Sequence, residues 1–483
     1  MVLVALLAMR LYEVSGEAPH RLTMGGKCSI LYSLDKTVRP FKKGAFQVTE
    51  ECPGLFFRES MPNNQIQKSA YIWNTAGSML GAFQSVIMLM VLTRVCDLET
   101  AGMFTIAYAS ANLFLNMGNY GMRNFQASDV APKYSFAAYA RSRIITDVAM
   151  LVCSTAYLAW SAITVGYGWY KIAVISCMTL FKLVDSIEDI TDGNYQQHGR
   201  LDVGGKLQTA RLASTLVVFC AITIAAGDLL VPLVIATVWT LVVYLGGVAL
   251  IRRRTGMPVM GESAGTSASR DVRALLKECF PLFLAAFLLF YIGNAPKYAI
   301  DAHLDDASQA IYGFIAMPVF VVGLLAQFIY MPIIEPLGRR WSNGDVQGFR
   351  REIFKQAGYI TVLTLICDAG SVLLGAPVLG ALYNTDLHPY VTDLVVLVTG
   401  GGFLAVTSLM TMGITIMREQ RHLTIGYAVV ATAALVLSPV AVRAAGIAGA
   451  SWIYLAMMAV LAAWFTGVFV RYSSIDCHER PLR

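Results

Sequence analysis

The chain is poor in charge and lacks the motifs of a metal site or a disulfide framework. Asp, Glu, Lys and Arg make up 14% of its 483 residues, against 56% hydrophobic residues, and the mean hydropathy is +0.59. So little charge excludes an ordinary soluble globular protein. The nine cysteines form no CxxC motif and no cluster with histidine, so neither bound zinc nor paired cysteines are expected. We therefore predict a protein that carries no metal and no other cofactor.

The sequence is rich instead in hydrophobic runs long enough to cross a bilayer. A helix needs about 20 apolar residues to span the ~30 Å hydrocarbon core. Such runs lie at about 70–92, 101–120, 144–165, 170–189, 209–227, 229–251, 279–299, 310–331, 358–382, 391–416, 423–442 and 446–470. The sequence thus predicts an all-α polytopic membrane protein with about twelve transmembrane helices.

The positive charges alternate between the loops that connect these runs. With the N-terminus inside, only Arg94, Lys171, Lys297 and Arg443 fall on the outer side and Lys182 lies within a span, so the rest of the 37 Lys and Arg are assigned to the inner side. This distribution predicts a plasma-membrane protein with both termini in the cytosol. We attribute the net charge of +6 to contacts with anionic headgroups, not to nucleic-acid binding.

The connections on the outer side are short. Membrane-bound glycosyltransferases, ligases and polymerases generally carry large catalytic domains, for which this chain has no room. We therefore expect that the protein is not an enzyme.

The hydrophobic runs divide into six and six at the inner connection 252–278. Residues 99–107 are similar to residues 308–316, at an offset of about 210, which indicates two parallel repeats. The expected architecture is two six-helix lobes around a central cavity. The predicted parts are an N-terminal tail 1–60 that is dispensable or wrongly annotated, an N-lobe 61–251, a cytosolic linker 252–278 with an amphipathic segment, a C-lobe 279–470 and a cytosolic tail 471–483.

One predicted helix carries a row of amides that ends in a guanidinium. Asn112, Asn116, Asn119 and Arg123 follow at spacings of 4, 3 and 4 and therefore share one helical face. Amides suit a hydroxyl-rich ligand, and arginine offers paired hydrogen bonds to phosphate. These four residues are candidate substrate-binding residues. Alternatively, the asparagines bond to neighbouring helices and Arg123 contacts lipid phosphate.

The fourth predicted span ends in a group of charges: Lys182, Asp185, Glu188 and Asp189. The first two lie one helical turn apart and could form a pair that neutralises itself. The alternative is an ion-coupling site, because the surplus of carboxylates could bind a cation or a proton.

The seventh span carries Asn294, Lys297 and Asp301, with Pro296 between them. A proline promotes a kink, so this helix could bend around a cavity. Asn294 and Lys297 are then candidate contacts for an anionic substrate, and Asp301 is a further ion-coupling candidate. Lys297 could instead extend outward and pair with Asp301.

Four other features are weaker candidates. Gln84 and Asp368 are polar residues at depth, Glu335 and Arg339 are spaced as an interfacial ion pair, and glycines 400–402 suit close packing.

Three short stretches resemble segments of bacterial lipopolysaccharide- and capsule-type biosynthesis proteins. They are Gly121–Gln126, Gln197–Asp202 and Asn294–Tyr298. Together with the pattern of spans over about residues 65–470, they resemble the polysaccharide flippase family of the multidrug/oligosaccharidyl-lipid/polysaccharide exporter superfamily. Parts of this superfamily have fourteen spans, and this chain lacks the two additional ones.

The resemblance implies a transporter of the bacterial inner membrane that works by alternating access. Its substrate would be a polyprenyl-diphosphate-linked oligosaccharide, moved from the inner to the outer leaflet for an O-antigen or a capsule. The diphosphate would lie in a cationic cavity, a role that we assign to Arg123 and Lys297. The implied partners are membrane lipid, glycosyltransferases and an envelope glycan polymerase. The alternative is a cation-coupled drug or metabolite antiporter of the same superfamily.

Overall fold

The computed structural model describes residues 64–128, 133–255 and 269–474. The predicted tail 1–60, part of the predicted linker and most of the predicted tail 471–483 lie outside these described residues. Throughout the described ranges every regular element is helical, as the sequence predicts.

The helices follow one another along the chain with short connections. They are α2 (Asn64–Val95), α3 (Leu98–Asn119), α4 (Met122–Ser128), α5 (Phe136–Thr164), α6 (Trp169–Gln197), α7 (Leu201–Ala226), α8 (Leu230–Thr255), α9 (Ser269–His303), α10 (Asp306–Tyr330), α11 (Ile334–Ser342), α12 (Val346–Gly370), α13 (Ala376–Tyr383), α14 (Val391–Ile416) and α15 (Arg421–Ser473). A turn of π-helix, Ser371–Gly375, joins α12 to α13, and turns of 3-10 helix lie at Met331–Ile333 and His388–Tyr390.

The described helices account for the twelve predicted spans. Nine helical segments are long and apolar enough to cross a membrane by length and composition. One of them, α15, contains two spans, because Gly446 has non-helical dihedral angles (φ 60°, ψ −133°) and breaks it. The other two predicted spans are α3 and α6, which have 22 and 29 residues but carry the rows of polar side chains.

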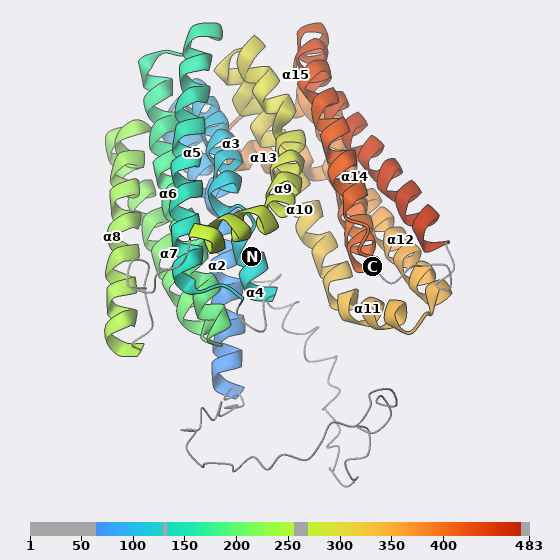
Figure 1. Cartoon of the computed structure of the whole chain (residues 1–483). Coiled ribbons are helices and arrows are strands. Elements are labelled where there is room, and N and C mark those ends of the chain that lie inside the picture. The colour runs from blue at the N-terminus through green and yellow to red at the C-terminus, as the bar shows by residue number, and fades with distance from the viewer. Residues whose placement is uncertain (1–63, 129–132, 256–268, 475–483) are drawn as a thin grey trace, which may run out of the picture. The chain divides into compact units, whose positions relative to one another are not determined.

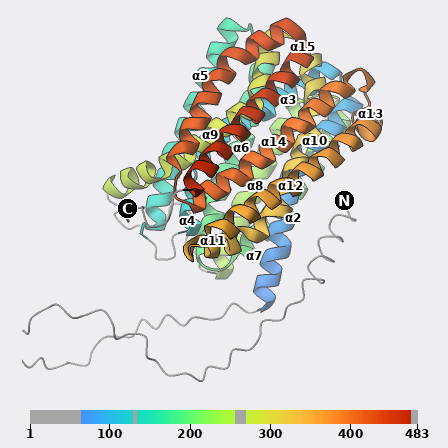
Figure 2. The same cartoon turned by 90° about the vertical axis from the view of Figure 1, so that its right-hand side faces the viewer.

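Within each half, helices that are distant in the sequence pack together as extensively as consecutive ones. We call α2–α8 the first half and α9–α15 the second half. In the first half α2 packs on α7 and α3 on α6, and in the second half α15 packs on α9 and α14. Figures 1 and 2 show the helices of each half grouped together.

The two halves meet most extensively where α3 crosses α10. Both helices begin at the end that the sequence assigns to the outer side, and both begin with an aspartate cap. The Asp97 and Asp305 carboxylates each accept a hydrogen bond of 2.8 Å from the backbone N–H three residues later. A side chain at Gly102 would lie 1.7 Å from the Asp306 carbonyl oxygen, so only glycine permits this approach. The two caps are 208 residues apart, one less than the offset between residues 99–107 and 308–316.

Helix α9 contacts both halves. Its first turns carry Leu275 and Cys279 into a buried cluster with Met122 and Ile190 of the first half. Beyond Pro281 the same helix packs along α15. Figure 1 shows the first turns at an angle to the rest of the helix, as expected for a segment that lies along the membrane surface.

Candidate functional site

A polar cavity of about 240 Å³ lies among the helices of the first half. Its lining carries three basic side chains and four carboxylates on α4, α6 and α7. The lining residues are Gly81, Gln84, Tyr108, Asn112, Asn119, Arg123, Lys182, Asp185, Glu188, Asp189, Asp192, Gln208, Arg211 and Leu212. In the described ranges, no group of His, Cys, Asp and Glu residues is arranged to hold a metal ion. The cavity offers hydrogen bonds and charges of both signs.

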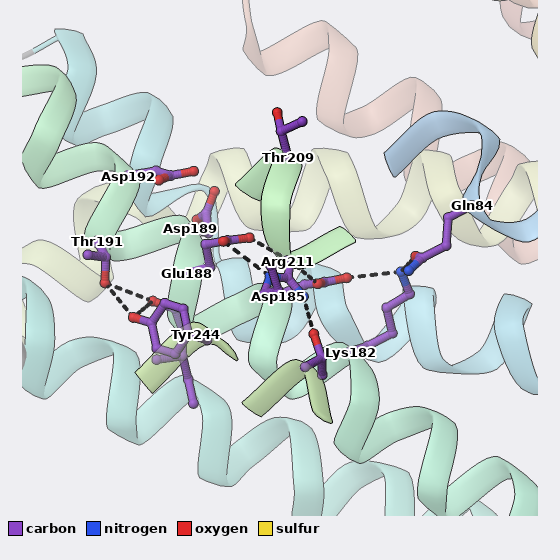
Figure 3. A network of polar contacts seen from close by, with 12 residues as sticks. Gln84, Lys182, Asp185, Glu188, Asp189, Thr191, Asp192, Thr209, Arg211 and Tyr244 are labelled. Carbon is purple, nitrogen blue, oxygen red and sulfur yellow. Dashed lines mark hydrogen bonds and ion pairs between the residues drawn. The ribbon is translucent and has the colours of Figure 1, made fainter. Parts of the chain in front are cut away.

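Arg211 of α7 lies at the centre of the charges that surround this cavity. Its guanidinium donates to Glu188 at 2.5 and 3.1 Å and to Asp185 at 2.7 Å. A further bond of 2.8 Å reaches the Thr240 hydroxyl. The side chain is 1% exposed, and a buried guanidinium is tolerated only with such complete pairing. Figure 3 shows Arg211 between the two carboxylates.

Lys182 extends the network toward α2. Its ammonium donates to Asp185 and to the Gln84 side-chain oxygen, both at 2.9 Å, and lies 4.7 Å from the centre of the Tyr108 ring. The predicted pairing of Lys182 with Asp185 is therefore present. It is not a closed pair, because Asp185 also binds Arg211.

A second buried arginine holds the next carboxylate of α6. Arg143 of α5 donates to Asp189 at 2.7 Å and to the Gly118 carbonyl at 2.5 Å. It also lies 3.3 Å from the side-chain oxygen of Asn119, which ties the end of the amide row to this network. Asp189 of α6 is therefore held by an arginine of α5 that is itself bound to α3.

Arg123 is the most loosely held cation of the cavity. Its guanidinium lies 3.6 Å from both Asp189 and Asp192, outside hydrogen-bond distance. Its side chain is 28% exposed, whereas those of Arg143 and Arg211 are 0% and 1% exposed. Arg123 is thus the cavity arginine that is freest to accept a new anionic partner.

The structure places the predicted residues in two groups. Seven of them line the cavity: Asn112, Asn119, Arg123, Lys182, Asp185, Glu188 and Asp189. Asn116, Asn294, Lys297 and Asp301 do not line it. The amides of Asn116 and Asn294 donate to backbone carbonyls one turn earlier, at 2.8 and 3.0 Å. Such bonds hold these two side chains along their own helices.

Lys297 of α9 is partly buried and, within the described residues, has no hydrogen bond and no ion pair. The alternative interpretation that it pairs with Asp301 is wrong for this structure. Asp301 instead binds Lys171 of α6 at 2.7 Å and accepts a hydrogen bond from Tyr167. Asp301 therefore belongs to a contact between the two halves.

The sequence analysis missed several members of the network. Arg143 and Arg211 were assigned to the inner side, because they lie near span ends where basic residues usually contact headgroups. Asp192 was also missed, although it lies three and four residues after Asp189 and Glu188 on α6. This spacing could have identified it. The partners of the two arginines, by contrast, come from other helices and leave no pattern in the sequence.

The weaker candidates have structural roles. Gln84 accepts from Lys182, Asp368 accepts a bond of 3.1 Å from Thr399, and Arg339 pairs with Glu335 at 2.6 Å on the surface. Side chains at glycines 400–402 would clash with or press on neighbouring helices, which confirms that they serve close packing.

Comparison with known proteins reveals similar structures but no similar sequences. No protein-family model matches the chain, and no curated protein matches it. An inward-facing multidrug resistance transporter of the MATE family, in the MOP superfamily, has a TM-score of 0.63 at 12% identity, over 85% of this chain and 100% of that chain. The lipid II flippase MurJ in an inward closed conformation has a TM-score of 0.63 at 10% identity, over 85% and 90%.

A third similar structure is a MOP superfamily transporter from Pyrococcus furiosus, for which reverse polarity of the binding pocket suggests a different function. Its TM-score is 0.51 at 13% identity, over 84% of this chain and 95% of that chain. These likenesses concern the fold. The chain thus has the multi-pass helical membrane fold that these transporters share, in agreement with the fold that the sequence predicts.

Proposed function

We propose that the protein flips a polyprenyl-diphosphate-linked oligosaccharide from the inner to the outer leaflet by alternating access. The substrate would serve an O-antigen, a capsule or a similar surface polysaccharide in the bacterial inner membrane, with both termini in the cytosol. Glycosyltransferases would supply it and an envelope glycan polymerase would use it. The fold supports transport, and one protein that shares it is a lipid II flippase.

The physical task of such a protein is to replace water around the headgroup. Sugar hydroxyls and phosphates lose their hydrogen bonds when they enter hydrocarbon, at a cost of several kcal/mol for each group. The cavity offers amides from Asn112 and Asn119 beside Arg123, while the polyprenyl tail can stay in the lipid. Rocking of the two halves would then move the opening of the site from one side to the other.

The observation that carries the proposal is that neither Arg123 nor Lys297 donates a hydrogen bond to a carboxylate within the described residues. A cation inside the membrane without a close counter-ion is costly, and a bound anion offsets that cost. Arg123 keeps its carboxylates at 3.6 Å, and Lys297 has none within the described residues. Both are therefore suited to a diphosphate.

The second candidate function is a cation-coupled drug or metabolite antiporter. The cavity favours it in one respect, because four carboxylates face three basic side chains in its lining. In either function Lys182, Asp185, Glu188 and Asp189 would couple transport to a proton or sodium gradient. Transport that continues unchanged after both gradients are collapsed would exclude this coupling.

The proposal is tested in cells that lack their own polysaccharide flippase. Wild type should restore surface glycan, whereas Arg123→Ala and Lys297→Ala should leave lipid-linked oligosaccharide inside at equal protein levels. Arg339→Ala is the matched control, because Arg339 is an exposed arginine of the surface. If Arg123→Ala and Lys297→Ala both match wild type, flipping stands and the two residues are not its site. If wild type exports nothing in several glycan backgrounds, the antiporter becomes the better proposal.

A further inference from the structure

The ion pairs at the outer ends of the two halves point to a link between opening and substrate release. We propose that Asp301 exchanges partners, binding Lys171 while the outer ends are together and Lys297 once they separate. The exchange rests on the proposed function, in which Lys297 contacts the diphosphate. By neutralising Lys297 in the outward-open state, Asp301 would weaken the hold on the substrate where it has to leave.

The ion pair that Asp301 forms in this structure joins the two halves of the protein. The Lys171 ammonium of α6 lies 2.7 Å from Asp301 on α9 and 2.6 Å from Asp306 on α10. The Tyr167 hydroxyl, also of the first half, donates to Asp301. The Asp301 side chain is only 2% exposed. Separation of the halves would remove both partners from this carboxylate at once and leave it available to another cation.

The second partner is already in place on the same helix. Lys297 lies four residues before Asp301 on α9, and side chains at this spacing occupy one face. It has no partner within the described residues while Asp301 is bound to Lys171. The i,i+4 spacing is the one at which a lysine and an aspartate of the same helix can form an ion pair.

Lys171 does not become isolated when it loses Asp301. Its ammonium lies 4.9 Å from the centre of the Tyr167 ring, which belongs to its own half. The lysine that changes most is thus Lys297, which is unpaired when the outer ends are together and paired when they are apart. A diphosphate that arrives from the inside would meet a free ammonium, and one that faces the outside would compete with Asp301.

A cross-link across the halves measures the exchange without any substrate. A Cβ at position 313 would lie 3.4 Å from Thr105 Cβ, close to the usual spacing in a disulfide. In a variant without the natural cysteines, Thr105→Cys with Gly313→Cys should cross-link only when the outer ends are together. Lys171→Gln should slow cross-linking, because it removes the cation that Asp301 binds when the outer ends are together. Lys297→Gln should speed cross-linking, because it removes the cation that Asp301 would bind when the outer ends are apart.

The decisive comparison repeats Lys297→Gln in an Asp301→Asn background. The exchange predicts that the acceleration disappears there, since no carboxylate is left to change partners. If Lys297→Gln changes the rate of cross-linking equally in both backgrounds, or in neither, the proposed partner exchange is wrong. Asp228→Asn is the matched control, because Asp228 accepts a 2.5 Å bond from Tyr170 inside the first half and should leave cross-linking unchanged.

Binding of geranylgeranyl diphosphate to the purified protein tests the consequence for the substrate. Lys171→Gln should lower the affinity about tenfold, within the usual range of coupling between sites, and adding Asp301→Asn should restore it. Failure of Asp301→Asn to restore the affinity would contradict the exchange. If the cross-linked Thr105→Cys, Gly313→Cys protein with Lys171, Lys297 and Asp301 intact does not bind the probe while the cross-linking comparison holds, the partner exchange stands and the proposed substrate is wrong.

Discussion

Removal of the Arg211 guanidinium is expected to destabilise the protein more than any change of a surface charge. Arg211→Met keeps much of the side-chain volume but leaves Glu188 and Asp185 without their main cation. Glu188 is 3% exposed, so water cannot replace the lost bonds. Breaking a buried ion pair from one side costs about 3–5 kcal/mol. Asp185 keeps Lys182 at 2.9 Å, so we expect the lower part of this range.

The free energy of unfolding can be compared by SDS titration in mixed micelles, followed by tryptophan fluorescence. The control is Arg339→Ala, which removes an exposed i,i+4 pair worth less than about 1 kcal/mol. Adding Glu188→Gln to Arg211→Met should recover part of the loss, because no unpaired charge then remains at that position. If Arg211→Met lies within about 1 kcal/mol of the control, the network does not depend on complete pairing, and the reasoning is refuted.

Three further predictions concern the contact between the halves and the anion site. Gly102→Val should hold the outer ends apart, because a side chain there would meet the Asp306 carbonyl at 1.7 Å, and this should abolish the 105–313 cross-link. Asp97→Ala should cost about 0.5–2 kcal/mol of stability through loss of a helix cap, and Asp97→Asn much less. Hydrogen bonds from the side chain and the backbone of Thr100 hold the pKa of Asp97 below its usual value. The charged cap is therefore fully formed at neutral pH, and its contribution should fall as the pH drops through this lowered pKa. Lys297→Arg should keep most of the transport that Lys297→Ala loses, measured as surface glycan, because the charge at that position is retained.

The helices were predictable because each depends on local composition. Runs of apolar residues long enough to span a bilayer recur from about residue 70 to residue 470, and the direction assigned to them from the basic residues stays a prediction. The break at Gly446 was anticipated by the gap between the predicted spans 423–442 and 446–470.

The site was predictable only where its members share a helix. Lys182, Asp185 and Glu188 follow the period of α6, and so do Asn112 and Asn119 on α3. Arg143 and Arg211 were not recognised as members of the site, because the carboxylates that they bind lie on a different helix. Asp301 was grouped with Lys297 because the two residues are four positions apart on one helix. Its actual partner, Lys171, is 130 residues away in the sequence and could not be inferred from periodicity.

Flipping of a polyprenyl-diphosphate-linked oligosaccharide by purified protein in liposomes tests the central claim most directly. The measured quantity is the rate at which substrate placed in one leaflet becomes accessible in the other to a reagent that does not cross the membrane. The account predicts that wild type and Arg339→Ala accelerate this rate over protein-free liposomes, and that Arg123→Ala and Lys297→Ala do not. A wild-type rate equal to that of protein-free liposomes, from protein shown to be folded and inserted, would contradict it.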